Sequence, residues 1–202
     1  MKHVLLALAC SAAVAAATGS ATNLSQNQQN TLTTIDSVPT KDQIDDAFDT
    51  PADAKQNLVA IATDPDPAPD AISIRLRAIH ALAKYCGTPP STPCTASDLA
   101  HQAVTSVITA TRTANAGSDV LILRAAIETL GTMKVSADVT ILNPLLNHPS
   151  RDIRAATARA LRDLCNTQAI SPLTERYSGE LTDQVKLAIS EALRILDQCS
   201  GI

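Results

Sequence analysis

The sequence contains almost no aromatic residues. Its 202 residues include no Trp, one Phe and two Tyr. Single-stranded nucleic acid would need aromatic side chains on which its bases stack, so this class of ligand is excluded. Hydrophobic residues make up 45% of the chain and are mainly Ala, Leu, Ile and Val. A core of such small and branched side chains favours closely packed helices over a sandwich filled by large rings.

Charge is also scarce, and basic charge especially. Charged residues make up 18% of the chain, below the ~25% usual in soluble domains. There are 16 Lys and Arg against 20 Asp and Glu, a net charge of -4. Binding to a phosphate backbone requires a basic face, so we expect no nucleic acid partner. At ~150 residues per domain, the length predicts one domain with at most an appendage.

Motifs for catalysis and metal binding are missing as well. The sequence contains no Gly-rich phosphate loop, nucleophile elbow or HExxH motif. It has no CxxC pair, and His80, His101 and His148 lack ligand spacing. His80 could act as a base only beside a nucleophile or paired carboxylate, which the sequence does not specify. The acidic segment 64–70 lacks the Gly and distal Glu of a calcium loop, and its prolines suit a stiff turn. We therefore predict no catalytic residue, no metal and no cofactor.

The one long hydrophobic run lies at the start of the chain. A short basic stretch, Met1 to His3, precedes apolar residues up to Val14 and small residues up to Ala21. This layout is typical of a secretory signal peptide over residues 1–21, and the run is shorter than the ~20 residues of a membrane span. We expect export to the periplasm or the cell exterior, with no membrane span in the mature chain. Lipidation of Cys10 is the alternative, which Ala in place of the usual lipobox Leu disfavours.

Residues 22–50 are expected to be a flexible polar tether. The first part, 22–40, is rich in Asn, Gln, Thr and Ser and has too few apolar residues to offset the entropy of ordering. Beyond Lys41, the spacing of Ile44, Ala47 and Phe48 indicates a short helical turn that ends before Pro51.

An internal repeat fills the rest of the chain. Four segments align over nine positions, each starting with a β-branched aliphatic residue and ending with Leu: 74–82, 122–130, 153–161 and 185–193. On a helix, positions one, five, eight and nine share one face, so each segment buries a narrow stripe. The last two intervals, of roughly 31 residues, hold two short helices each. A two-helix unit cannot bury its stripe alone, so the units must stack.

A partner helix is expected before each segment, at 52–63, 97–113, 137–147 and 168–177. Ser118, Ser150 and Thr182 lie where the later segments need an N-cap. Strand patterns are nearly absent. The sequence therefore predicts an all-α fold, an α-solenoid of about four stacked helical hairpins over residues 51–202.

The motif [VI]-[RK]-x-A-A-x-x-A-L, complete in segment 153–161, resembles the second helix of a HEAT-like repeat. The spacing is similar to that of the short bacterial HEAT repeats also found in phycobilisome lyase subunits. The resemblance covers roughly residues 52–199, with Leu123 replacing the basic residue in one copy. It implies an α-solenoid that binds other macromolecules along its concave face and has no catalytic residues.

Charged side chains recur on the second helices outside the buried stripe. Basic residues at or next to position two could form a stripe for an acidic partner, or an Asp–Arg ladder between repeats with Asp70, Asp119, Asp152 and Asp183; we favour the ladder. Residues at position seven and beyond could bind a partner or form a plain solvated face. The full set of candidate partner-binding residues is Arg75, His80, Lys84, Arg124, Glu128, Arg154, Arg159, Arg162, Lys186, Glu191 and Arg194.

The cysteines beyond the signal peptide are Cys86, Cys94, Cys165 and Cys199. An even number in an exported chain predicts disulfides, with three possible connectivities. We expect Cys86–Cys94, because prolines bend the short segment between them, and Cys165–Cys199, because both end second helices of neighbouring hairpins. The competing pair, Cys86 and Cys165, should be held apart by the intervening hairpin.

Together these features predict an exported scaffold that binds a protein of unknown identity through its concave face. We expect a monomer and not an enzyme. The alternative is a lyase-type enzyme subunit or ligand-binding solenoid. A lyase-type subunit that binds a bilin would need aromatic side chains around its pocket, and the sequence contains few.

Overall fold

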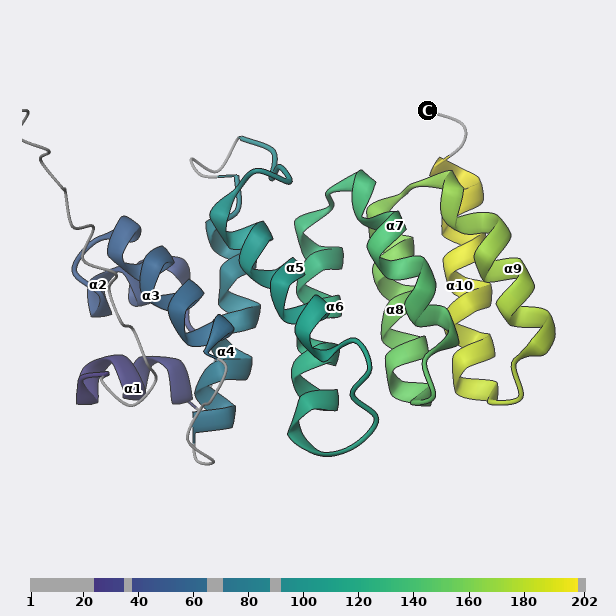
Figure 1. Ribbon diagram of the computed structural model, residues 1–202. Coiled ribbons are helices and arrows are strands. Elements are labelled where there is room, and N and C mark those ends of the chain that lie inside the picture. Colours follow the sequence, from purple (N-terminus) through teal and green to yellow (C-terminus); the bar gives the residue numbers. More distant parts are fainter. Residues whose placement is uncertain (1–23, 35–37, 65–70, 88–91, 200–202) are drawn as a thin grey trace, which may run out of the picture.

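The computed structural model describes residues 24–34, 38–64, 71–87 and 92–199. Regular structure within these residues is entirely helical, which confirms the predicted all-α class. Figure 1 shows the helices following one another along a single axis. The expected signal segment, 1–21, lies outside the described residues.

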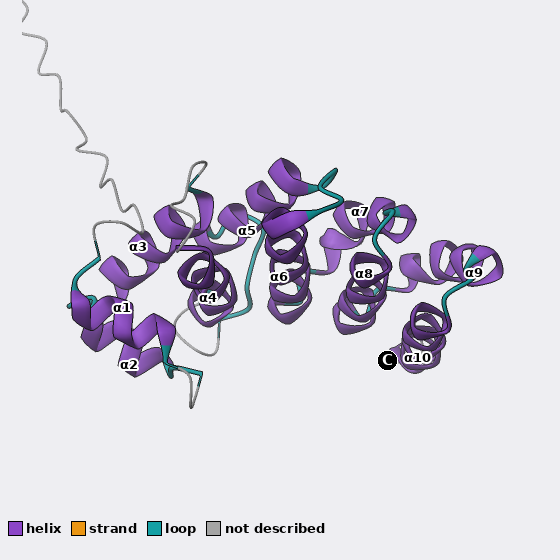
Figure 2. Cartoon of the chain, turned by 90° about the horizontal axis from the view of Figure 1, so that it is seen from below, coloured by secondary structure: helices purple, strands orange, loops and turns teal. Residues whose placement is uncertain are grey.

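Four helical hairpins form the body of the fold. Each pairs a first helix with a second helix: α3 (Pro51–Thr63) with α4 (Ile72–Leu82), α5 (Leu99–Thr111) with α6 (Gly117–Met133), α7 (Val139–Leu142) with α8 (Arg151–Leu164), and α9 (Ile170–Gly179) with α10 (Asp183–Cys199). Neighbouring second helices pack against each other from α4 to α10. Figure 2 shows first and second helices in two rows, with the second helices on the inner side of the curved stack. The predicted α-solenoid is confirmed.

The predicted stripe is the core of this stack. Positions one, five and eight are buried in all four second helices, as is position nine except for the partly buried Leu193. The helices α6 and α8 lie close together at Gly131, where an added Cβ would lie 2.8 Å from Ala160 Cα. Small residues at this crossing let the backbones come together, as the Ala-rich stripe predicts.

The first helix of the third hairpin departs from the sequence prediction. In place of one helix over 137–147, the structure has 3-10 turns at Ser136–Asp138 and Asn143–Asn147 on either side of the short α7. Pro144 explains why α7 ends in the second turn, because it has no N–H to continue the α-helical ladder. The caps also differ: Ser118 lies within α6, and Ser150 is the N-cap of α8 without a side-chain hydrogen bond.

The prediction of a flexible tether is wrong for the part of residues 22–50 that the structure describes. Residues Gln26–Thr33 form helix α1, whose N-cap Ser25 makes a capping box with Gln28. Leu32 is fully buried, because α1 packs on α4. Helix α2 (Lys41–Ala47), which confirms the expected short helix, packs on α3.

These two helices form an N-terminal cap on the solenoid. In the regular hairpins second helices pack on second helices, and α3 packs on α5, whereas α1 packs on α4 and α2 on α3. The cap is thus not another repeat. Its apolar residues Leu24, Leu32, Ile44 and Phe48 join the core, which covers the end of the stack that would otherwise be open.

Both predicted disulfides are present. Cys86 and Cys94 are joined with a Cα–Cα distance of 4.9 Å, and Cys165 and Cys199 with 5.7 Å. The second bridge ties the end of α8 to the end of α10, as the repeat register predicts.

Candidate interaction surface

We call the solvent-exposed surface of the second helices, α4, α6, α8 and α10, the inner face. Position seven of each second helix reaches this surface: His80 and Glu191 are exposed, and Glu128 and Arg159 are half-buried. The helices that carry these side chains lie side by side along the inner side of the curve (Figure 2). The solenoid therefore presents sequence-distant charged groups on one continuous row of helices.

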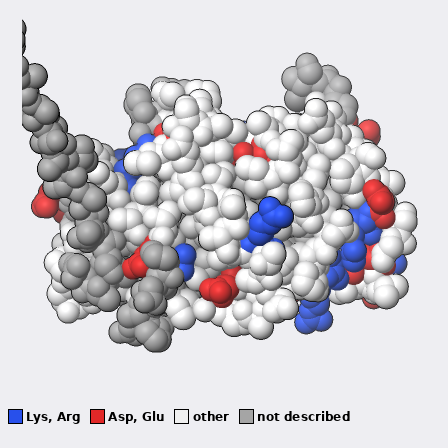
Figure 3. Space-filling model, in the orientation of Figure 1, with Lys and Arg blue, Asp and Glu red and all other residues white. Residues whose placement is uncertain are grey.

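Charge is distributed unequally between the two rows of helices. Helix α5 has no Asp, Glu, Lys or Arg, and neither has the segment 139–147 around α7. Figure 3, which views the first helices, shows few charged atoms over the middle of this side, with charges gathered towards the C-terminal end. The second helices carry most of the charged candidates. The two sides of the solenoid thus offer different chemistry to a partner.

Two ion pairs on the inner face join candidate residues to each other. Arg124 Nε is 2.8 Å from Glu128 Oε1 within α6, and Arg162 Nη1 is 3.1 Å from Glu191 Oε1, which links α8 to α10. In both cases hydrogen-bonded carboxylates raise the pKa of the arginine, Glu128 for Arg124 and Asp163 chiefly for Arg162. These guanidinium groups are therefore fixed positive charges.

Some of the candidate bases on the inner face have no acidic partner at salt-bridge distance within the described residues. Arg159 and Arg194 belong to this group. Lys186 instead lies over the ring of Tyr177, with Nζ 5.9 Å from the ring centroid. Arg159 and Arg194 can pair with an external carboxylate without breaking an internal ion pair.

Two candidate residues are buried, and their assignment to the partner-binding surface is wrong. Arg75 is 7% exposed and donates from Nε to the carbonyl of Ala62 at 3.0 Å. Arg154 is 8% exposed and donates from Nη1 to the carbonyls of His148 and Pro149. Both arginines thus fasten a second helix to the end of the first helix before it. Position two lies beside the buried stripe, so the apolar stem follows the core inward.

The Asp–Arg ladder is only partly present. Burial lowers the pKa of Arg75, and the carboxylates of Asp119 and Asp64 oppose that lowering, which places Asp119 in the predicted electrostatic relation to the preceding repeat. Arg154, however, pairs with Glu180. Asp152 contacts its neighbour Arg151 at 3.9 Å. Asp70 lies outside the described residues.

Glu180 is the centre of a buried polar network that the sequence did not reveal. It is 2% exposed and accepts two hydrogen bonds from Arg154, two from Arg176, and one each from the backbone N–H groups of Leu181 and Thr182. Hydrogen bonds from Arg154, and then from Arg176, hold the pKa of Glu180 far below its usual range, against the opposing effect of burial. The network joins the third hairpin to the fourth and is structural.

A second buried pair lies on the side of the first helices. His101 Nε2 is 2.8 Å from Asp138 Oδ2, and His101 Nδ1 has no hydrogen-bond partner in the described structure. The pair connects α5 to the turn before α7. Both side chains are almost inaccessible, so the pair holds neighbouring hairpins together and meets no substrate. Among the described residues, no group of three His, Cys, Asp or Glu side chains could hold a metal ion.

A pocket of about 300 Å³ opens where the N-terminal cap meets α4. Val38, Pro39, Ile44 and Ala81 supply apolar walls, and the remaining lining residues are Arg77, His80 and Lys84. Two predicted candidates, His80 and Lys84, thus come together here, with Arg77, which sequence reasoning missed. The repeat pattern does not single out Arg77, because its side chain lines a pocket only where the cap packs against α4.

No described helix is both long and apolar enough to cross a membrane. Residues 111–194 match a family model described as HEAT repeats. The matched region runs from the end of α5 through most of α10, where the helices α6, α8 and α10 carry the most regular repeats. No curated protein matches the chain.

Proposed function

We propose that this chain, a helical scaffold whose residues 111–194 are HEAT repeats, is exported and binds another protein along its inner face. HEAT-repeat scaffolds commonly mediate protein interactions. Export is supported by the signal-peptide pattern of residues 1–21 and by two disulfides, which persist in oxidising compartments.

The observation that carries the proposal is the charge on the inner face. Arg159 and Arg194 lie there on neighbouring helices, α8 and α10, and neither has an acidic partner at salt-bridge distance in the part of the chain that the structure describes. Desolvating such charges against complementary carboxylates gives an interface its specificity and speeds encounter. The opposite side, over α5 and α7, offers hydroxyl and amide groups with hardly any charge.

We further propose that the chain is not an enzyme, since HEAT repeats generally form non-catalytic scaffolds. The lyase-type alternative is not carried forward, because neither Tyr nor Phe is among the described residues that line the pocket beside α4.

The proposal is tested by capture of partners from the envelope extract of the native cell, followed by charge reversal on each side. The tagged chain should retain a defined set of proteins, and the double variant Arg159→Glu, Arg194→Glu should lose them. Arg112→Glu is the matched control, because Arg112 is an exposed arginine at the end of α5. Equal capture by the wild-type chain and the inner-face variant would contradict the proposal.

Export is tested separately by the N-terminus of the protein recovered outside the cytoplasm. Cleavage after Ala21 predicts that the mature chain begins at Thr22. A chain that keeps Met1 and stays in the cytoplasm would remove this part of the proposal and leave the scaffold function standing.

A further inference from the structure

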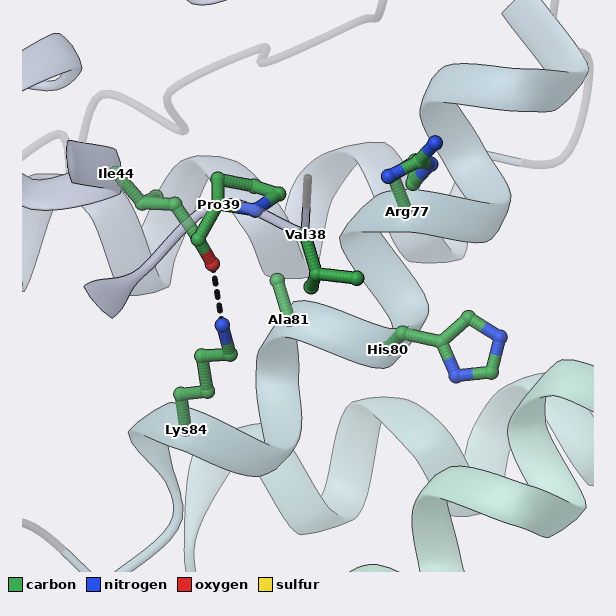
Figure 4. Close-up of a pocket in the computed structure, with 7 residues that line it drawn as sticks. All are labelled: Val38, Pro39, Ile44, Arg77, His80, Ala81 and Lys84. Atoms are coloured by element: carbon green, nitrogen blue, oxygen red, sulfur yellow. Dashed lines mark hydrogen bonds between the residues drawn. The ribbon is translucent and has the colours of Figure 1, made fainter. Parts of the chain in front are cut away.

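The pocket beside α4 combines an apolar interior with cationic side chains. Arg77, His80 and Lys84 are spaced so that one face of α4 and its continuation carries all three. Figure 4 shows Val38 and Pro39 crossing over this face, with Lys84 reaching towards Pro39 and with Arg77 and His80 beyond Val38. Among the described residues, no carboxylate lines the pocket. Its charge therefore complements an anion, although the whole chain is acidic.

Most of the donors in the pocket are available to a ligand. Arg77 uses Nη2 for one hydrogen bond to the carbonyl of Thr34, at 3.1 Å, and Lys84 uses Nζ for one to the carbonyl of Pro39. Neither cation belongs to a salt bridge within the described residues. A guanidinium group has five N–H donors and an ammonium group three, so each retains donors for a carboxylate.

His80 adds a third polar group at the same edge. Its Nδ1 lies 3.3 Å from Thr129 Oγ1, which connects the pocket to α6. The pocket is thus continuous with the row of second helices that forms the inner face. A partner that runs along the inner face would reach the pocket at the N-terminal end of its path.

We propose that this pocket binds an acidic segment of the protein partner, in which an aliphatic side chain stands next to Asp or Glu. The aliphatic side chain packs against the exposed Val38, over the buried Ile44 and Ala81 that form the floor of the pocket, and the carboxylate pairs with Arg77 and Lys84. The volume of about 300 Å³ is at the lower end of the range for ligand pockets, so one side chain and its neighbouring carboxylate fill it. The inference rests on the proposed function, because it names the chemistry of the protein partner.

The test uses three peptides and the full chain, expressed for export so that both disulfides form. The peptides are rhodamine-labelled, amidated at the C-terminus and identical except for a central Leu-Glu, Leu-Gln or Ser-Glu pair. Binding is followed by fluorescence anisotropy and by amide shifts in two-dimensional NMR spectra. The Leu-Glu peptide should shift the amides of Ile44, His80 and Ala81. The other two should bind more weakly, by about tenfold, because each lacks one half of the complementary chemistry.

Variants of the chain sharpen the result. The double variant Arg77→Gln, Lys84→Gln should bind the Leu-Glu peptide about tenfold more weakly than the wild-type chain does. Its affinity for the Leu-Gln peptide should be unchanged. Val38→Asp should abolish binding, and it keeps the test decisive if the double variant does not fold, since Val38 is 71% exposed. Leu121→Asp is the control, an exposed leucine of α6 that does not line the pocket.

Three results would overturn the pocket assignment: equal affinity for the Leu-Glu and Leu-Gln peptides, loss of binding in Leu121→Asp as well as Val38→Asp, or no amide shift in the pocket with any peptide. Shifts confined to α8 and α10 would also overturn it, but would leave the scaffold function intact. Failure of the Arg159 and Arg194 variants to affect partner capture, with pocket binding retained, would instead contradict the wider inner-face proposal.

Discussion

Arg154 and Glu180 form a buried bidentate ion pair: Nε lies 2.7 Å from Oε2, and Nη2 lies 2.9 Å from Oε1. The pair joins α8 to the turn that leads into α10, so it fastens the last hairpin to the one before it. Because Arg154 also donates to the carbonyls of His148 and Pro149, one side chain connects three segments of the solenoid.

Removing the charge of Glu180 should destabilise the fold. In Glu180→Gln the guanidinium group of Arg154 stays buried without a counter-ion, which typically costs about 3–5 kcal/mol. Chemical denaturation followed by circular dichroism measures the change. Glu175→Gln is the matched control, because Glu175 is an exposed acid of α9, the helix that ends just before Glu180. If both variants unfold at the same denaturant concentration, the network does not hold the last hairpin.

The same carboxylate should make stability depend on pH. The pKa of Glu180 is lowered in the folded chain, so its contribution is complete above the pKa of the unfolded state, about 4.3, and declines as the pH falls further. The free energy of unfolding should therefore decrease from about pH 5 downward, and this slope should be smaller in Glu180→Gln. Identical slopes for wild type and variant between about pH 5 and pH 2 would contradict the assignment.

The contact between α6 and α8 should not tolerate a methyl group at Gly131. An added Cβ would lie 2.8 Å from Ala160 Cα and 3.0 Å from its Cβ, so the backbones must separate. Gly131→Ala should cost about 1–3 kcal/mol through overpacking, reduced by the ~1 kcal/mol gain in helix propensity. Thermal unfolding measures it.

Gly179→Ala is the control for this substitution, since nothing lies within 4 Å of the Cβ position in α9. It should be neutral or slightly stabilising. A stabilised Gly131→Ala would mean that the two helices do not cross at Gly131 and Ala160.

The two disulfides should contribute unequally. Cys165–Cys199 closes a separation of 34 residues and Cys86–Cys94 one of 8. The chain-entropy relation then gives about 4 kcal/mol for the former and about 2.5 kcal/mol for the latter. Paired Cys→Ala variants of each bridge, compared by urea denaturation, should show the larger loss for Cys165 and Cys199. Free thiols in the exported protein would show that the bridges do not form.

The repeated parts of the fold were predictable from sequence, because each second helix repeats the same stripe and each copy supports the register of the others. That register also placed Cys165 and Cys199 at equivalent helix ends. The cap was missed because α1 has a polar composition and buries Leu32 as its one fully buried residue. Its capping box, Ser25 with Gln28, was the available signal.

The buried arginines and Glu180 could not be assigned correctly from sequence, for different reasons. Arg75 and Arg154 occupy a position between the buried stripe and the exposed face, where a long side chain can follow either direction. Glu180 has no equivalent in the other repeats, and it meets Arg154 across 26 residues of sequence. Contacts that occur once, between segments distant in sequence, leave no periodic pattern to detect.

Site-specific photo-cross-linking tests the central claim, that a partner binds along the inner face, most directly. A photoreactive phenylalanine analogue is placed at Arg159 or Arg194 on the second helices, and at Thr109 or Arg112 on α5, in cells that export the chain. All four positions are at least partly accessible to solvent. The inner-face positions should give a discrete adduct with one protein, and the α5 positions should give none. Adducts from α5 alone would place the partner on the opposite side and contradict the account.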